Sequence, residues 1–332
     1  MQYYLGVDSG GSKAAYALVS QTGETISLHI GAGYARTVDR TELTVSQITQ
    51  GVQDCLAQSP VELAQVRGVC FGLSYYGELS IKDAEVIRAL RDAFNGTEHY
   101  ITNDSEVGWA GSLACKPGVN IVAGTGAIAY GQNKAGACAR AGGWAHFFSD
   151  EGSCYWLGRK AMKLFSKQAD GRIPKGPLYD IVRASFSLKD DFDFIELMER
   201  EYIPSRRKVA EFQIVLEQAV TEGDQSAALI YEECTDELLL SISAVANQLG
   251  FLDERFLVSY SGGLFRPADT RDATARAKEA HVVAPLRRKV EALGGVLQKP
   301  LLEPWQGAAL CAIRQFCPEA LDEAARNMLK NR

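Results

Sequence analysis

The chain has 332 residues, of which 46% are hydrophobic and 23% are charged, and its formal net charge is −6. This length and composition supply enough apolar residues for two cores and show no bias toward disorder. The acidic balance and the absence of a dense Lys/Arg block argue against a nucleic-acid or anionic-membrane partner. The two short basic runs, Arg206-Arg207-Lys208 and Arg287-Arg288-Lys289, lie in helix-like sequence and are interpreted as solvated helix faces.

Targeting signals are not evident in the sequence. The first residues, Met1-Gln2-Tyr3-Tyr4-Leu5, contain neither a basic segment nor a long apolar one, which argues against a signal peptide. No apolar run approaches the roughly 20 residues that a membrane helix requires. We therefore expect a cytoplasmic protein that does not interact with membranes.

The cysteines do not form a metal or disulfide pattern. The chain has eight cysteines and four histidines, and no two cysteines are spaced as C-x-x-C. Scattered cysteines of this kind are typical of buried thiols, so we expect neither a zinc site nor a disulfide framework.

Strand-like and helix-like segments alternate through the first third of the chain. The expected strands cover residues 3–8, 14–20, 24–30, 66–73 and 99–102, and the expected helices cover residues 41–58 and 81–94, with a third helix opening at 103–104. Three strands in a meander, followed by strand–helix repeats, indicate a mixed sheet covered by helices.

The same pattern then starts again. Expected strands cover residues 118–123, 127–131, 137–141 and 255–260, a mostly helical segment covers 152–249, and the helical tail covers 305–330. The restart suggests a duplicated architecture with a break near residues 116–118. We expect an N-terminal domain of residues 1–116 and a C-terminal domain of residues 117–332, with a helical insertion over about 152–250. The last helix is a candidate for packing back on the N-terminal domain.

Three of the expected strands end in turns of small residues. The turns are Asp8-Ser9-Gly10-Gly11-Ser12-Lys13, Gly124-Thr125-Gly126 and Ser261-Gly262-Gly263. Glycine lets backbone N–H groups approach a phosphate closely, and clusters of such groups bind anions. The commoner nucleotide motifs, G-x-x-x-x-G-K-[ST] and G-x-G-x-x-G after a strand, are absent.

The order and spacing of these turns resemble the outline of the actin-like, sugar-kinase and heat-shock ATPase superfamily. The resemblance implies two actin-like (ribonuclease H-like) α/β domains, each a mixed five-stranded sheet with flanking helices, and an ATP cleft between them. It also implies that the first two turns hold the phosphates of ATP and the third holds the adenosine. The residues implied in nucleotide binding are Asp8, Gly10, Gly11, Ser12, Lys13, Gly124, Thr125, Gly126, Gly262 and Gly263.

Two carboxylates are candidates for the chemistry. Asp8 ends the first strand, and its expected role is to hold Mg²⁺, through water, since Mg²⁺ keeps several of its waters. Asp104 opens a helix directly after a strand, where it could cap the helix or act as a general base. Phosphoryl transfer needs an oriented nucleophile, and a carboxylate at hydrogen-bond distance from the acceptor hydroxyl can provide that orientation.

The most specific segment is Gly142-Gly143-Trp144-Ala145-His146-Phe147-Phe148-Ser149-Asp150-Glu151-Gly152-Ser153-Cys154-Tyr155-Trp156. It resembles the Gly-Gly-Trp-x-His-x-x-x-Asp-Glu-Gly-Ser-x-x-Trp stretch of the N-acetylglucosamine kinases, and the resemblance extends over nearly the whole chain. It implies that Asp104 is the base and that Gly143, Trp144 and Asp150 bind the sugar. It further implies transfer to the sugar 6-OH, with ATP and Mg²⁺ as cofactors and a homodimer as the assembly.

Two parts of the sugar pocket depart from this family. Where the family has an Asn after the third strand, this chain has Ala35-Arg36, and where it has a small hydroxyl residue after the fourth core strand, this chain has Tyr75-Tyr76. Tyr76 and Arg36 are therefore candidate sugar-binding residues. Because loss of a buried hydrogen-bond partner discriminates strongly against a ligand, the acceptor could be N-acetylglucosamine, glucosamine, a muramic-type sugar or another hydroxylated ligand.

Two other functions stay open at this stage. An activator ATPase would couple ATP hydrolysis to an iron–sulfur cluster shared by a dimer, and Cys138 and Cys154 are the candidate ligands. A sugar-binding regulator would keep the fold without catalysis, although such proteins usually carry an added DNA-binding segment. The sequence favours the kinase, because Asp8, Asp104 and the Asp150 segment are all present.

Overall fold

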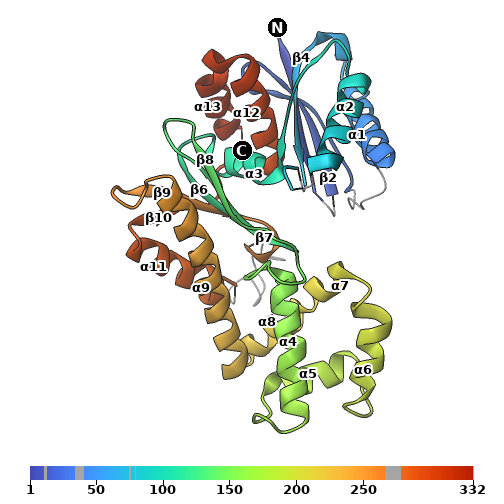
Figure 1. The fold of residues 1–332 in the computed structure, drawn as a ribbon, viewed down its shortest axis with the longest axis vertical. Helices are drawn as coiled ribbons and strands as arrows, with labels where there is room; N and C mark the ends of the chain where they lie inside the picture. Colours follow the sequence, from blue (N-terminus) through green and yellow to red (C-terminus); the bar gives the residue numbers. More distant parts are fainter. Residues whose placement is uncertain (11–12, 34–40, 75, 79, 266–277, 332) are drawn as a thin grey trace. The chain divides into compact units, whose positions relative to one another are not determined.

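The computed structural model describes residues 1–10, 13–33, 41–74, 76–78, 80–265 and 278–331 (Figure 1). Five residues of the sequence predictions, Gly11, Ser12, Ala35, Arg36 and Tyr75, lie outside the described residues. The chain divides into two compact units, one of Met1–Pro117 with Lys299–Arg332 and one of Gly118–Gln298. The division after residue 117 falls one residue from the expected limit. Residues 299–332 belong to the first unit, whereas the expected division placed them in the C-terminal domain, with the last helix as a candidate for packing back on the N-terminal domain.

The first unit is built on a mixed five-stranded sheet in the order β3-β2-β1-β4-β5. Its strands are β1 (Tyr3–Ser9), β2 (Lys13–Ser20), β3 (Thr25–Ala32), β4 (Val66–Leu73) and β5 (Glu98–Asn103). β1, β2 and β3 form an antiparallel meander, whereas β4 runs parallel to β1 and β5 runs parallel to β4. β1, β2 and β4 are almost entirely buried, as expected for strands covered on both faces.

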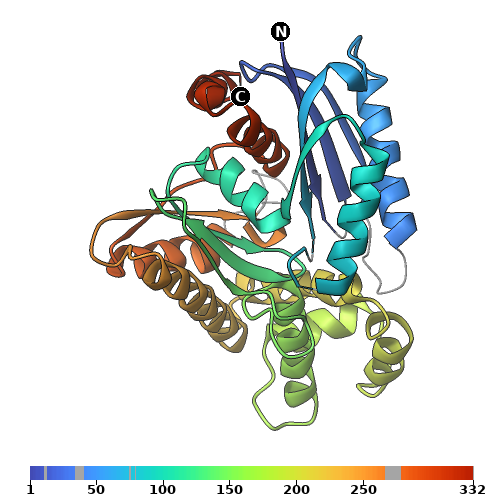
Figure 2. The ribbon, with the colours of Figure 1, turned by 45° about the horizontal axis from the view of Figure 1, so that its top comes forward.

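Helices cover both faces of this sheet (Figures 1 and 2). They are α1 (Thr41–Leu56), α2 (Ser80–Ala93), α3 (Asp104–Leu113), α12 (Pro304–Phe316) and α13 (Leu321–Lys330). α1 and α2 pack on one face around Leu5, Leu18 and Phe71. On the other face α12 lies directly on the sheet, since a Cβ at Gly6 would stand 2.3 Å from the Ala309 nitrogen. Glycine therefore permits the close approach that anchors the C-terminal helices to the first sheet.

The second unit contains a second mixed five-stranded sheet, in the order β10-β9-β6-β7-β8. Its strands are β6 (Gly118–Ala123), β7 (Ala127–Gln132), β8 (Cys138–Gly142), β9 (Phe256–Ser261) and β10 (Gly295–Leu297). β6, β7 and β8 form a second antiparallel meander, while β9 runs parallel to β6 and β10 parallel to β9. The two sheets thus repeat one topology, which confirms the expected fold of two mixed five-stranded sheets with flanking helices.

Helices make up the rest of the second unit. They are α4 (Cys154–Ala169), α5 (Pro177–Ser185), α6 (Asp193–Leu197), α7 (Arg206–Glu211), α8 (Gln213–Thr221), α9 (Gln225–Gln248) and α11 (Ala284–Ala292), with π-helical turns at Met198–Tyr202 and Glu279–Val283. α9 packs along the second sheet, and α4 to α8 gather into a helical group (Figures 1 and 2). No helix among the described residues is long and apolar enough to cross a membrane.

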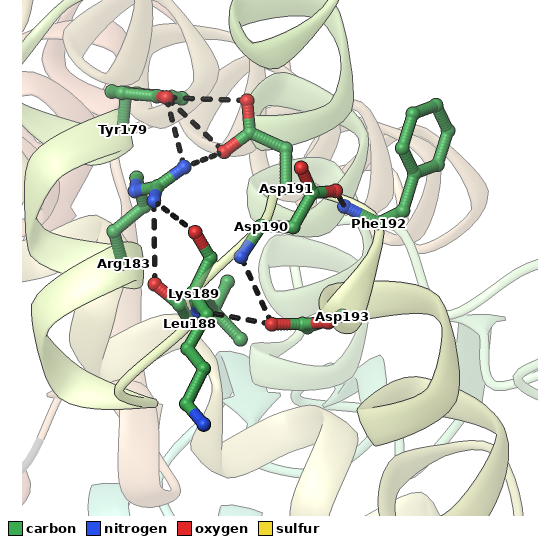
Figure 3. A network of polar contacts seen from close by, with 8 residues as sticks. All are labelled: Tyr179, Arg183, Leu188, Lys189, Asp190, Asp191, Phe192 and Asp193. Carbon is green, nitrogen blue, oxygen red and sulfur yellow. Dashed lines mark hydrogen bonds and ion pairs between the residues drawn. The ribbon is translucent and has the colours of Figure 1, made fainter.

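The connection between α5 and α6 is held by a polar network (Figure 3). Arg183 forms an ion pair with Asp191 and donates to the Leu188 and Lys189 carbonyl oxygens at 3.3 and 3.0 Å. The Asp193 carboxylate accepts from the Lys189 and Asp190 amides, each at 2.9 Å. Side chains thus satisfy the backbone groups that this tight connection leaves unpaired, so we assign the network a structural role.

Candidate functional site

The carboxyl ends of three parallel strands in the first unit lie at one edge of its sheet. Ser9 of β1 is paired with Leu73 of β4, which is paired with Asn103 of β5. Asp8 is one residue from the end of β1, and Asp104 directly follows β5, so both carboxylates belong to this edge. Two strand spacings separate β1 from β5, or about 10 Å. In open α/β sheets this edge is where ligands bind.

Asp104 is the first residue of α3 and is half-buried. Asn103, the N-cap residue, accepts a hydrogen bond from the Ser105 amide at 2.9 Å and donates one to the Tyr76 carbonyl oxygen at 2.9 Å. One side chain therefore caps the helix and also holds the loop that follows β4. The capping role that the sequence allowed for Asp104 is therefore filled by Asn103, and Asp104 is not the cap.

The first turn of α3 is anchored by a second acidic residue, which is buried. Glu106 forms an ion pair with Arg314 of α12, and its carboxylate accepts from the Thr102 hydroxyl at 2.5 Å and the Tyr100 hydroxyl at 3.0 Å. The Arg314 guanidinium also lies 5.4 Å from the centre of the Trp109 ring. These contacts join α3 to both β5 and α12, so the helix that begins at Asp104 is held from two sides.

The loop after β4 is fixed at both of its ends. The Ser74 amide donates to the Ser9 carbonyl oxygen at 3.0 Å, and the Gly77 amide donates to the Asp83 carboxylate at 2.9 Å. The Tyr76 ring packs against the core of the first unit, and burial raises the pKa of its hydroxyl. The structure therefore places the Tyr76 backbone beside the Asp104 helix and its ring on the core.

Two glycine turns of the second unit lie side by side. Gly124-Thr125-Gly126 links β6 to β7, and Gly262-Gly263 follows the end of β9. A Cβ at Gly262, where φ is +103°, would stand 2.3 Å from the Ala123 carbonyl oxygen, and a Cβ at Gly124 would stand 3.6 Å from the Gly263 nitrogen. Only glycine is tolerated at position 262, because the backbone φ and the neighbouring atoms both exclude a side chain. The two turns that the sequence predicts to bind nucleotide thus meet at one edge of the second sheet.

Asp150 lies directly beside the first of these turns. Its carboxylate accepts from the Ala127 amide at 3.3 Å and from Arg206 Nη2 at 2.6 Å, and its side chain is 4% exposed. Burial raises the pKa of this carboxyl, and the Arg206 charge acts in the opposite direction. Asp150 has a left-handed φ of +62°, which Asp tolerates better than most residues.

The start of α4 completes this arrangement. The Cys154 amide donates to the Gly124 carbonyl oxygen at 2.8 Å, and the Ser153 hydroxyl caps the helix by accepting from the Trp156 amide at 3.1 Å. We call the loop of residues 142–153 the aspartate loop. Asp150 attaches it to Ala127, directly after the glycine turn, and Cys154 attaches the helix that follows it to Gly124.

Trp144 in the aspartate loop is exposed. Its fractional exposure is 72%, and Phe147 and Phe148 of the same loop are 82% and 68% exposed. Positive φ angles at Gly142, Gly143 and Ala145 turn the backbone on either side of it. Trp144 is therefore free of the core of its own unit and available for contact with a ligand.

His146 packs inward from the same loop. Its ring meets Tyr155 edge-on at 5.0 Å between centres, and burial lowers its pKa. This agrees with a structural interpretation of His146 rather than a catalytic one.

A sequence model of the BadF/BadG/BcrA/BcrD ATPase family matches residues 5–312. The chain belongs to this family. The match spans nearly all of both units, so it includes both glycine turns of the second unit together with Asp8, Asp104 and Asp150.

Curated relatives of this ATPase-family chain are sugar kinases by name. The N-acetylmuramic acid/N-acetylglucosamine kinase of Clostridium acetobutylicum is 29% identical over 270 residues, covering 80% of this chain and 86% of the relative. The N-acetyl-D-glucosamine kinase of Dictyostelium discoideum is 25% identical over 276 residues, covering 79% and 85%. These two relatives confirm the resemblance of the sequence to the N-acetylglucosamine kinases.

Solved structures confirm the fold. A Chromobacterium violaceum protein, described provisionally as an N-acetylglucosamine kinase, matches with a TM-score of 0.72 at 22% identity, covering 93% of this chain and 98% of that one. A ROK family glucokinase from Streptomyces griseus, solved with glucose and AMPPNP, matches with a TM-score of 0.59 at 15% identity, covering 95% and 99%.

The position of Asp8 is compatible with binding of a Mg²⁺ ion that is also bound to a nucleotide. No group of three or more His, Cys, Asp or Glu side chains that could hold a metal occurs among the described residues. Asp8 offers carboxylate oxygens as possible metal ligands at the carboxyl edge of the first sheet. A single protein carboxylate suits Mg²⁺, which takes its other ligands from phosphate and water in kinase sites.

The cysteine pair of the activator-ATPase hypothesis does not share one environment. Cys138 is exposed on β8, whereas Cys154 is buried at the start of α4, where burial raises the pKa of its thiol to about 12. Cluster ligands are thiolates, and a buried thiol of raised pKa resists ionisation. This geometry disfavours the pair as cluster ligands.

Proposed function

We propose that this chain is an ATP-dependent kinase that phosphorylates a hydroxyl, the 6-OH, of an amino sugar. The observation that carries the proposal is the carboxyl edge of the first sheet, where Asp8 and the capped helix start at Asp104 come together. The sugar-kinase names of the curated relatives point to the same acceptor class. Both named relatives act on N-acetylglucosamine, so N-acetylglucosamine is the first acceptor to test, followed by glucosamine and N-acetylmuramic acid.

In the proposed reaction Asp104 accepts the proton of the acceptor hydroxyl as the hydroxyl oxygen attacks the γ-phosphorus of ATP. The bond between that phosphorus and the β–γ bridging oxygen breaks, and ADP leaves. The contacts of Glu106 hold the start of α3, and with it the Asp104 backbone, in one place. Asp8 would hold Mg²⁺ through water, and the metal would neutralise charge on the phosphates.

The second unit supplies the other binding groups in this proposal. Backbone amides of Gly124–Gly126 hold phosphate, with Gly10 and Lys13 of the first unit as further contacts, and Gly262-Gly263 hold the adenosine. Asp150 accepts hydrogen bonds from sugar hydroxyls, and Gly143 and Trp144 flank the ring. An exposed, rigid aromatic side chain is suited to the apolar face of a sugar.

The function is tested by measuring ATP consumption and phosphosugar formation over a panel of N-acetylglucosamine, glucosamine, N-acetylmuramic acid, glucose and a polyol. We expect an amino sugar to give the highest kcat/KM, with ADP and sugar phosphate formed in equal amounts. ATP turnover without a phosphorylated product would contradict the kinase and favour an ATPase.

A homodimer stays a prediction, to be measured by analytical ultracentrifugation.

Gly262→Ala is expected to weaken ATP binding by at least about tenfold, since a methyl group there meets the Ala123 carbonyl oxygen and displaces the turn. Gly250→Ala is the matched control, because Gly250 has a positive φ of +71° but nothing within 4 Å of its added Cβ. Isothermal titration with a non-hydrolysable ATP analogue measures both variants. If both variants bound the ATP analogue with equal affinity, the Gly262 turn would not be part of the nucleotide site.

A further inference from the structure

Arg206 is a candidate for a role that its sequence context did not indicate. It is the first residue of α7, preceded by the N-cap Ser205, and it stands 56 residues beyond Asp150 in the chain. Its neighbour Arg207 is 74% exposed and pairs with Glu211 on the same helix, which is a solvated helix face as expected. Arg206 is 28% exposed and points instead to Asp150.

The contact lies at the glycine turn. A Cβ built on Gly126 would stand 3.0 Å from Arg206 Nη2 and 3.1 Å from both Asp150 carboxylate oxygens. The guanidinium, the carboxylate and the turn therefore occupy one small volume of the second unit. Glycine at position 126 leaves the space that the ion pair fills.

Among the described residues, two groups donate hydrogen bonds to the Asp150 carboxylate. Asp150 is nearly excluded from solvent, and a buried carboxylate is stable only when it is paired and hydrogen-bonded. The Ala127 amide provides one hydrogen bond from the backbone of β7, and Arg206 provides the other together with a full positive charge. The other charged or titratable groups that act on it, His146 and Glu151, belong to its own loop.

We infer that Arg206 is a positioning residue for the proposed sugar-kinase reaction, holding the Asp150 carboxylate in one orientation beside the Gly124–Gly126 turn. The inference rests on the proposed function, in which Asp150 reads the sugar hydroxyls. A charge-assisted hydrogen bond fixes the direction in which the remaining carboxylate lone pairs point. The helical group of α4 to α8 thereby contributes one residue, Arg206 of α7, to the proposed sugar site.

The pH dependence follows from the same contact. Burial raises the pKa of Asp150, whereas Arg206, the Ala127 amide and His146 lower it and Glu151 raises it. Asp150 must be ionised to accept hydrogen bonds from two hydroxyls, so activity falls as the pH drops through its pKa. Removal of the Arg206 charge raises that pKa further, and the acid limb of the activity profile moves to higher pH.

The test compares Arg206→Met, Arg206→Lys and the matched control Arg207→Met, using the panel sugar with the highest kcat/KM in the wild type. For Arg206→Met we expect kcat/KM for the sugar to fall at least about tenfold, with the KM for ATP changed less than about threefold. The acid limb should move to higher pH. Arg206→Lys, which keeps the charge, should recover part of both losses, and Arg207→Met should match the wild type.

A second readout does not depend on activity. A ¹³C-carboxyl NMR titration of Asp-labelled protein, with the Asp150 signal assigned by Asp150→Asn, should show a higher Asp150 pKa in Arg206→Met than in the wild type. An unchanged Asp150 titration, or an Arg206→Met profile like that of Arg207→Met, would overturn the inference. A wild type that phosphorylates no sugar would overturn the proposed function instead, and the titration would still decide whether Arg206 controls Asp150.

Discussion

Replacement of Asp104 by Asn is expected to lower kcat by about 10²–10⁴-fold, because the amide cannot accept the proton of the acceptor hydroxyl. The change is nearly isosteric, and the cap of α3 is the Asn103 side chain, so the helix start should be preserved. ATP affinity should therefore stay within about threefold of the wild type. Steady-state kinetics with the preferred amino sugar, together with titration of an ATP analogue, measure the two effects.

Asp92→Asn is the matched control for this variant. Asp92 is exposed on α2 of the same unit, so the same loss of one negative charge occurs away from the sheet edge. We expect wild-type kinetics from it. If Asp104→Asn kept near-full kcat, Asp104 would not be the base, and another group would have to accept the proton.

Arg314→Leu is expected to lower the free energy of unfolding by about 3–5 kcal/mol, because it leaves the buried Glu106 carboxylate without its counter-charge. Glu106 is 7% exposed, and after the change the Thr102 and Tyr100 hydroxyls would be its remaining donors among the described residues. Urea denaturation measures the loss. Since α12 and α3 are joined by this pair, the transition should also become less cooperative.

The double variant Glu106→Leu/Arg314→Leu separates the charge effect from packing. Removal of both charges from a buried pair is often neutral, so the double variant should recover much of the stability. Arg326→Leu, an exposed position on α13, is the surface control and should change the stability little. A double variant no more stable than Arg314→Leu would show that the side-chain volumes, and not the uncompensated charge, hold the two helices together.

Local patterns in the sequence predicted most of the secondary structure. The strand expected over residues 66–73 is β4, the strand expected over 118–123 is β6, and the helix expected to open at 103–104 begins at Asp104. Such segments are predictable because alternation, helical period and glycine turns act over a few residues. The short strand β10 was not predicted, since three strand residues produce too little pattern, and of α11 only the helix-like run at 287–289 was noted.

The arrangement of the candidate sugar site was predicted in part. The aspartate loop was identified from its residues, and the structure places Asp150 beside the glycine turn as one connected arrangement. Tyr76 was chosen because of its position after β4, yet its ring packs on the core while its carbonyl oxygen binds Asn103. Sequence position indicates which loop a residue belongs to but not the direction in which its side chain points.

The sequence by itself determined the carboxylates and glycine turns that the kinase interpretation requires, since these are local features of strand ends. Only the tertiary structure decided that Arg206, interpreted from sequence as a solvated helix face, pairs with Asp150. It also decided that residues 299–332, of which only the last helix was considered for this position, belong to the first unit, where α12 packs against the glycines of β1 and α3. Both results depend on contacts between residues far apart in the chain, which packing and burial select and local periodicity does not encode.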